Sequence, residues 1–404
     1  MPLRYPASLR FPSLRRRAAR GLMRWLFGPP AEAWQAPLPG SGIHRILVCH
    51  VSHTLGNTLL LTPLLQELER IYPGAEIDIV TRSPIAAQLY GRYFGVARLF
   101  HLPAHGAAHL WTVLRQWHRV RAGEYDLAID TDAQSQTGRL LILWARARFR
   151  LGFSGPRKSG RISHPVPVEL APAHKAHRAV FLLAQARGTA APAHCPPLDI
   201  QLDADERQRG QATLERVLAA GQAGGPRRGV IGVFANATGS KRLEQGWWQA
   251  FLDRLQALEP HYHLVEIVPA SGRSLLGDRY PAFFSNDLRR LGGVLSALDL
   301  CVIGDCGVMH LSCAVHTRTL ALFVTTDAEE WGPYGALDHV LQARRDDPAA
   351  AADAAAEALR HPLAADDDVP HRSWMAASGE LRRPLPAPRV ACAQPGVVHG
   401  PSHH

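Results

Sequence analysis

Three kinds of feature are scarce in this chain of 404 residues, and each absence removes a class of protein. No apolar run is long enough to cross a bilayer as a helix, and no apolar segment with a following cleavage site marks a secretory signal. The six cysteines form no Cys-x-x-Cys pair, which argues against a structural zinc site and for a reducing compartment. Neither a G-x-G-x-x-G fingerprint nor a P-loop lysine motif is present, so a dehydrogenase-type or P-loop nucleotide site is disfavoured.

Lysine is nearly absent as well. Only Lys158, Lys175 and Lys241 are found among the 45 basic residues. A lysine kept in a loop of such an arginine-rich chain is a candidate for a compact cation that contacts phosphate, although an ordinary exposed lysine gives the same pattern.

The net charge of +10 is concentrated at the N-terminus, where seven arginines precede the first acidic residue, Glu32. Apolar residues are interspersed with them, and residues 11–27 arranged as a helix present a basic face beside an apolar one that includes Trp25. Such a helix favours an anionic membrane surface. Residues 1–42 are therefore predicted to be a membrane-surface leader, and a disordered basic segment without a partner is the open alternative. No nucleic-acid motif follows, so we expect no nucleic-acid partner.

Residues 43–205 and 206–360 are predicted to form two domains in which strands and helices alternate. Apolar runs indicate buried strands at 43–49, 76–80, 127–129, 229–234, 263–268, 300–303 and 319–323. Helical segments are predicted over 58–71, 140–148, 174–186, 247–258, 291–298, 309–315 and 349–359. This alternation predicts the α/β class with a pair of doubly wound domains. The Pro/Ala/His-rich residues 361–404 are predicted to be largely disordered.

The segment from Leu300 to Ala314 is the most informative part of the chain. It predicts a buried strand that ends in Asp305, a turn at Gly307, and a helix that begins at once. Free backbone N–H groups and the positive end of the helix dipole then point beyond the strand. Such a position suits a phosphate or diphosphate.

Two further segments accompany this unit, Gly56 to Pro63 after the first strand and Trp331 to Gly335. In this order and spacing, the three segments resemble glycosyltransferase family 9, the bacterial heptosyltransferases that build the lipopolysaccharide inner core from ADP-heptose. The resemblance runs from about His44 to about Gly335. It implies the GT-B fold, in which two Rossmann-like domains face each other across a cleft, and a transfer with inversion that needs no metal or other cofactor.

Inverting transfer requires a base for the acceptor hydroxyl, positive charge or N–H donors for the leaving diphosphate, and exclusion of water. The resemblance implies a donor site made by Thr238, Ser240, Lys241, Asp305, Cys306, Gly307 and His310. Lys241 would stabilise the diphosphate, and Asp305 would meet the donor sugar or cap the next helix. His310 is more typical of a hydrogen-bonded histidine that anchors a helix than of a catalytic one.

The catalytic base departs from the family pattern. The family usually has Asp after the first-loop glycine, and this chain has Asn57, which cannot accept a proton at neutral pH. His53 in the same loop and Asp132 after the strand 127–129 are candidate replacements, while Asp130 suits a structural role. The pair Asp130 and Asp132 also spells D-x-D, but a metal site is not expected. A protein that binds a sugar nucleotide and transfers slowly or not at all is the alternative.

For the acceptor, Gly56 and the basic loop 152–165, with Arg157 and Lys158, are the candidate contacts. A basic surface suits an acidic lipid-linked glycan, and a solvated basic loop is equally consistent. The segment after Val268 lacks the acidic cluster that family members use near the ribose, which weakens the prediction of ADP. Trp331 to Gly335 either shapes the site near the donor or packs the interdomain surface.

The sequence therefore predicts a cytoplasmic glycosyltransferase, peripheral at the inner face of the inner membrane. It would move a heptose-like sugar from a nucleotide diphosphate to a lipopolysaccharide core or similar acidic glycan. A catalytically impaired sugar-nucleotide or glycan-binding relative and a protein O-heptosyltransferase are the alternatives.

Overall fold

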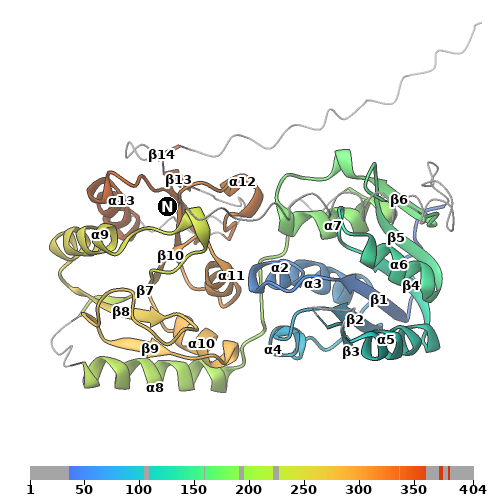
Figure 1. The fold of residues 1–404 in the computed structure, drawn as a ribbon, viewed down its shortest axis with the longest axis horizontal. Coiled ribbons are helices and arrows are strands. Elements are labelled where there is room, and N and C mark those ends of the chain that lie inside the picture. The colour runs from blue at the N-terminus through green and yellow to red at the C-terminus, as the bar shows by residue number, and fades with distance from the viewer. Residues whose placement is uncertain are drawn as a thin grey trace, which may run out of the picture.

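The chain forms two α/β domains that lie side by side in the computed structural model (Figure 1). The structure describes residues 36–103, 109–158, 160–190, 195–221, 227–335 and 337–360, together with the backbone of 373–375 and 381–382. The basic leader and most of the C-terminal tail lie outside the described residues, and so do the predictions made for them.

The N-terminal domain is built on a six-stranded parallel sheet. Its strands are β1 (Arg45–His50), β2 (Glu76–Thr81), β3 (Val96–His101), β4 (Glu124–Asp130), β5 (Arg146–Ser154) and β6 (His164–Pro167), in the spatial order β3-β2-β1-β4-β5-β6. Its helices are α2 (Leu55–Leu59), α3 (Thr62–Ile71), α4 (Ala86–Tyr90), α5 (Leu110–Ala122), α6 (Gln136–Trp144) and α7 (Lys175–Ala186). The strand order reverses between β1 and β4, the position where open α/β sheets bind ligands.

The C-terminal domain repeats this plan. Its first six strands are β7 (Gly229–Phe234), β8 (Tyr262–Val268), β9 (Ala282–Phe284), β10 (Leu300–Gly304), β11 (Thr319–Phe323) and β12 (His339–Gln342), in the order β12-β11-β10-β7-β8-β9. Its helices are α8 (Ala204–Ala220), α9 (Gln245–Leu258), α10 (Leu288–Leu295), α11 (Gly307–Ala314), α12 (Ala328–Trp331) and α13 (Pro348–Arg360). The order reverses between β7 and β10, so each domain has one switch point.

Two short strands extend this second sheet beyond β12. Strand β13 (Ser373–Met375) pairs with β12 in parallel, and β14 (Leu381–Arg382) pairs with β13 in antiparallel orientation. Both lie in the tail that we expect to be largely disordered, so within the described residues this part of the tail is paired.

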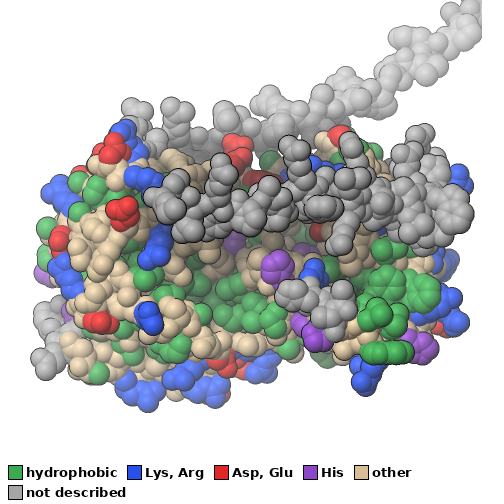
Figure 2. Space-filling model, viewed as in Figure 1, with side chains coloured by type: hydrophobic (Ala, Val, Ile, Leu, Met, Phe, Trp, Pro, Cys, Tyr) green, Lys and Arg blue, Asp and Glu red, His purple; other side chains and the backbone are tan. Residues whose placement is uncertain are grey.

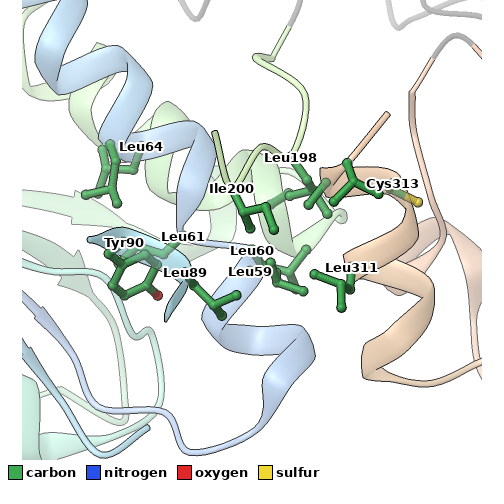
Figure 3. Packing of buried hydrophobic residues seen from close by; sticks show 14 of the residues in the cluster. Leu59, Leu60, Leu61, Leu64, Leu89, Tyr90, Leu198, Ile200, Leu311 and Cys313 are labelled. Carbon is green, nitrogen blue, oxygen red and sulfur yellow. The ribbon is translucent and has the colours of Figure 1, made fainter. Parts of the chain in front are cut away.

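One cluster of buried apolar side chains includes residues of both domains. Figure 3 shows Leu59 and Leu60 of the α2 region close to Leu311 of α11, with Leu198 and Ile200 of the linker beside them. All five side chains are buried. Hydrophobic packing at this point holds α2 of one domain against α11 of the other.

A polar contact between the domains lies at Arg289 on α10. Its guanidinium donates to the Glu206 carboxylate at 2.5 and 2.6 Å and to the carbonyl oxygen of Gln88 at 3.0 Å. The Arg289 side chain is 16% exposed, so water screens these bonds little. Arg289 lowers the pKa of Glu206 to about 2, mainly through these hydrogen bonds. The interaction joins α8 and α10 of the C-terminal domain to α4 of the N-terminal domain, at a second place of contact between the domains.

The helix predicted over 58–71 is interrupted at Leu60 and Leu61, because Pro63 has no N–H to continue the ladder and lies in the first turn of a new helix, α3. The helix predicted over 291–298 is α10, which begins at Leu288 and ends at Leu295. The predicted helix 140–148 runs only to Trp144. From Arg146 onward, arginines alternate with apolar residues at a period of two, and the segment is strand β5.

Candidate active site

The predicted site residues gather at the two switch points. In the N-terminal domain, Asn57 lies on α2, directly after β1, and Asp132 lies in the loop after β4. In the C-terminal domain, the loops after β7 and β10 carry Lys241 and Asp305. Because α2 packs against α11, these two edges meet between the domains. The fold therefore brings together residues that are far apart in the sequence.

In the N-terminal domain, His50 connects α2 to the segment that follows β4. Its Nε2 lies 2.8 Å from the carbonyl oxygen of Asn57, and its Nδ1 lies 2.9 Å from Oγ1 of Thr131. A carbonyl oxygen only accepts, so Nε2 carries the hydrogen. Burial lowers the pKa of His50, so the ring is neutral and Nδ1 accepts from the Thr131 hydroxyl. No motif in the sequence marks His50, whose only signal is its position at the end of the first strand.

The two candidate bases have different surroundings. His53 is exposed in the loop between β1 and α2. Asp132 is half-buried, and its Oδ1 accepts the backbone N–H groups of Gln134 at 2.6 Å and Ser135 at 3.0 Å. The negative charge of Asp132 also acts on His50, whose ring contacts Asn57. His53 precedes Asn57 in the chain, whereas the charge of Asp132 acts on the His50 ring that contacts the Asn57 carbonyl oxygen.

In the C-terminal domain, Lys241 forms an ion pair with Asp305. Nζ of Lys241 lies 2.8 Å from Oδ2 of Asp305. The lysine side chain is 32% exposed and the aspartate side chain 6% exposed, so the ammonium can be reached from outside while the carboxylate is largely enclosed. The pair combines a reachable cation with a fixed buried anion at the start of α11.

Thr238 and Ser240 are exposed on the loop that carries Lys241. Arg345 fixes this loop from below, because its guanidinium donates to the carbonyl oxygens of Ser240 and Arg242, the second at 3.0 Å. Arg345 is remote in the sequence, and nothing in the pattern around it signals this contact. The backbone of the loop that carries Thr238 and Ser240 is therefore fixed at Ser240 and Arg242.

The start of α11 is in contact with α2. A Cβ on Gly307 would lie 2.9 Å from Cβ of Leu55 and 3.0 Å from the backbone nitrogen of Gly56, and a Cβ on Gly56 would lie 2.9 Å from Cδ2 of His310. Side chains at either glycine would therefore separate the two segments. The two glycines allow the loop after β1 to approach the expected diphosphate position directly.

His310 differs from the expected hydrogen-bonded anchor. Its Nδ1 is buried and has no hydrogen-bond partner within the part of the chain that the structure describes. Burial lowers its pKa to about 4, with a smaller opposing effect of Asp305, so the imidazole is neutral at pH 7. The ring lies against Gly56 at the interdomain contact.

Cys306 occupies the position before the first residue of α11. Burial raises the pKa of its thiol to about 11, so the thiol is not ionised at neutral pH. Cys301 and Cys313 are buried and free, as expected for small apolar residues in this unit.

Lys158, which is predicted from the sequence to contact the acceptor, is buried in an ion pair. Nζ of Lys158 lies 2.7 Å from Oδ2 of Asp130, also donates to the carbonyl oxygen of Ser135, and its side chain is 1% exposed. Arg139 lies 3.5 Å from the same carboxylate oxygen. Lys158 therefore fixes the loop to the end of β4 and is not accessible to a ligand, while Arg157 is exposed. Asp130 has the structural role that the sequence suggested.

The segment 331–335 packs the interdomain surface. Tyr334 stacks edge-on against His174 and His177 of the N-terminal domain, at ring distances of 5.0 and 4.9 Å, and its hydroxyl donates to the carbonyl oxygen of Pro196 at 2.8 Å. Lys175 forms an ion pair with Glu330 at 2.6 Å. Of the two interpretations of this segment, the structure supports packing between the domains.

The loop after β8, which lacks the acidic cluster of the family, is held by hydrogen bonds to Glu266 of β8. The buried carboxylate of Glu266 accepts the Ser274 hydroxyl at 2.6 Å and the backbone N–H of Leu275 at 2.7 Å. These bonds hold the Glu266 carboxylate inside the domain, where it is 1% exposed. Within the described residues, no three His, Cys, Asp or Glu side chains are grouped closely enough to hold a metal ion, and no helix is long and apolar enough to cross a membrane.

Two Rossmann-like domains with site residues at both switch points define the GT-B class. The fold of the chain is that of several solved structures. A glycosyltransferase family 9 protein from Veillonella parvula aligns with a TM-score of 0.61 at 17% identity, covering 75% of this chain and 87% of that one. The heptosyltransferase WaaC of E. coli, solved with ADP, gives 0.59 at 19% identity, and the E. coli ADP-heptose heptosyltransferase II gives 0.60 at 17%, each covering 78% of this chain and 99% of the other.

The resemblance to glycosyltransferase family 9 is confirmed at the level of sequence for the C-terminal half. Residues 285–357 match the model of glycosyltransferase family 9 (heptosyltransferase), a family of glycosyltransferases. This segment includes Asp305, Cys306, Gly307 and His310. No protein with a curated function matches the chain by sequence.

Proposed function

We propose that this protein is an inverting glycosyltransferase that moves a heptose-like sugar from a nucleotide diphosphate, ADP-heptose first among the candidates, to an acidic glycan such as a lipopolysaccharide core. The observation that carries the proposal is the ion pair of Lys241 and Asp305 at the start of α11, with Gly56 in contact with the same helix. A leaving diphosphate needs a cation and N–H donors, and a site closed by two domains excludes water.

In this proposal, Lys241 turns from Asp305 to the diphosphate when the donor binds. The lysine side chain is one-third exposed, so this movement requires no opening of the core. Asp305 then has its carboxylate available for a sugar hydroxyl. Thr238 and Ser240, held by the Arg345 contact, add hydroxyl donors to phosphate. The neutral His310 contributes no charge to the site.

The acceptor hydroxyl needs a base, and Asn57 does not supply one. Asp132 is our first candidate and His53 the second, because Asp132 is coupled through His50 to the backbone of Asn57. The reaction would be metal-independent, with the charge of the leaving group met by Lys241 and the N–H groups of α11. Arg157 is the candidate for contact with the acidic acceptor on the N-terminal domain.

The experiment is turnover of ADP-heptose with a deacylated Kdo-lipid acceptor by the wild type and by the Lys241→Ala, Asp132→Asn and His53→Gln variants. We expect turnover by the wild type in EDTA, loss with Lys241→Ala, and loss with one of the two base variants. Lys175→Ala, which removes an interdomain lysine away from Asp305, is the matched control and should retain turnover.

The presence of Asn57 in place of an acidic residue supports one second function, in which the protein binds the sugar nucleotide without transferring the sugar. If the wild type binds ADP but only Asn57→Asp shows turnover, this second function is correct. Absence of both ADP binding and turnover in all variants would contradict both proposals.

A further inference from the structure

Helix α5 exposes apolar side chains to solvent. Leu110 is 57% exposed, Trp111 85% and Leu114 49%. Val120 is the one residue of this helix that is fully buried. Single exposed apolar residues are ordinary, but three neighbours on one helix, one of them tryptophan, form a patch of the kind that marks an interaction site.

The apolar strip continues onto α6. The rings of Trp117 and Trp144 lie 6.1 Å apart, and Nε1 of Trp144 donates to the carbonyl oxygen of Trp117 at 3.1 Å. The guanidinium of Arg121 lies over the Trp144 ring at 4.5 Å and donates to the Trp144 carbonyl oxygen at 2.9 Å. These contacts hold the two helices together, so the strip is a preformed surface of the N-terminal domain.

Charge of one sign surrounds this strip. No acidic residue occurs between Asp78 and Glu124, and none between Asp132 and Glu169, so α5 and α6 contain no carboxylate. Exposed arginines accompany the apolar residues on α5 and at the start of β5: Arg115, Arg119, Arg121, Arg146 and Arg148. A carboxylate oxygen of Glu124, the first residue of β4, lies 4.0 Å from the guanidinium of Arg146. Figure 2 shows apolar side chains gathered over α5, with basic and histidine side chains around them.

We propose that this surface, the α5 face (Leu110, Trp111, Leu114, Arg115 and Arg119), binds an anionic lipid surface. Tryptophan and leucine insert shallowly at the headgroup level, while arginines beside them are attracted to anionic headgroups. The absence of carboxylates on α5 and α6 removes the repulsion that such a surface would meet. A lipid surface fits this exposed strip of apolar and basic side chains better than a nucleic acid does, since non-specific binding of single strands uses a groove that follows the backbone.

The position of the α5 face is relevant to the acceptor. Helix α5 begins after β3 ends, and the ends of parallel strands lie at one edge of the sheet, so Leu110 and Trp111 lie on the same edge as Asn57 and Asp132. A membrane bound there would present lipid-linked glycans toward the loops after β1 and β4. This consequence rests on the proposed function, whereas lipid binding by the α5 face does not.

The experiment measures co-sedimentation of the full chain with vesicles of equal parts phosphatidylglycerol and phosphatidylcholine, and with phosphatidylcholine alone. Two variants change the α5 face, Trp111→Ser with Leu114→Ser and Arg115→Glu with Arg119→Glu. Matched controls change the C-terminal domain, Phe284→Ser and Arg209→Glu with Arg216→Glu. All are made also with Arg15, Arg16 and Arg17 replaced by Glu, so that the leader does not hide the effect.

We expect the partition onto anionic vesicles to fall at least roughly fivefold for each α5 arginine replaced by Glu, because the loss of one basic residue near such a surface costs about 1 kcal/mol and the new carboxylate adds repulsion. The apolar variant should lose at least as much, and the controls should bind as the parent does. Equal binding by α5 variants and controls, or equal binding to neutral and anionic vesicles, would overturn the proposal. So would arginine-dependent binding of single-stranded RNA without vesicle binding.

Thermal unfolding of each variant checks that the fold is retained. Turnover with the deacylated, water-soluble acceptor should be unchanged by the α5 substitutions, since this acceptor needs no membrane. A wild type that binds vesicles but shows no turnover would contradict the proposed function. The proposal that the α5 face binds lipid would still hold.

Discussion

Gly56 of the N-terminal domain lies directly against His310 of the C-terminal domain. A Cβ at Gly56 would be 2.9 Å from Cδ2 of His310 and 3.6 Å from Cα of Gly307. Helix α2, which carries Asn57, and the helix that begins at Gly307 are therefore in contact through a residue without a side chain. This contact links the proposed acceptor side to the proposed donor side.

Gly56→Ala should destabilise the protein and reduce activity together. The added methyl group must displace either His310 or the loop after β1, and such overpacking costs about 1–3 kcal/mol. Urea unfolding and turnover measure the two effects. Gly246→Ala is the matched control, because a Cβ there meets no atom within 4 Å, and it should leave both values nearly unchanged. Equal stability of the two variants would show that the loop adjusts freely.

Lys158→Met should lower the free energy of unfolding by about 3–5 kcal/mol, because it leaves the buried carboxylate of Asp130 with Arg139 alone at 3.5 Å. Arg157→Met, at an exposed position, should change it by no more than about 0.5 kcal/mol. The double variant Asp130→Asn with Lys158→Met should recover most of the loss. A Lys158→Met variant with unchanged stability and weaker acceptor binding would instead support the acceptor role.

Stability should fall as the pH is lowered from 6.5 to 4, in part because of His310. Its folded pKa of about 4 lies below the ordinary value of 6.5, so the unfolded state binds more protons in this interval. One such histidine contributes a slope of up to about 1.4 kcal/mol per pH unit, and the slope disappears above pH 6.5.

His310→Gln should remove this part of the slope, measured by urea unfolding at several pH values. His44→Gln, at an exposed position, is the control and should leave the slope as in the wild type. A slope that is the same in both variants would mean that His310 is not held neutral by burial.

Arg345→Ala should loosen the loop from Thr238 to Arg242, because two backbone carbonyls lose their donor. Amide hydrogen exchange in this loop should become faster, and ADP should bind roughly fivefold more weakly, which corresponds to about 1 kcal/mol. Arg344→Ala is the control, since its guanidinium pairs with the exposed Asp346 at 2.8 Å. Faster exchange with unchanged ADP affinity would show that the loop does not contact the nucleotide.

The sequence by itself determined the central strands of both sheets and the class of fold. Buried parallel strands are continuous apolar runs, so β7, β10 and β11 lie within one residue of their predicted bounds. The strand-turn-helix unit at Asp305 also follows from local chemistry, because a glycine and a helix start are specified by neighbouring residues. The family resemblance in this half rests on the same local pattern, and residues 285–357 match the family model.

Only the tertiary structure decided which polar groups meet. His50 contacts Asn57 and Thr131, Lys158 pairs with Asp130, and Arg345 supports the loop of Lys241 across about a hundred residues. Such contacts depend on which strands are neighbours and on how the two domains pack, and no periodicity in the chain encodes them. The same holds for the α5 face, because burial is a property of the assembled fold: only there is Trp111 left in solvent while Val120 is enclosed.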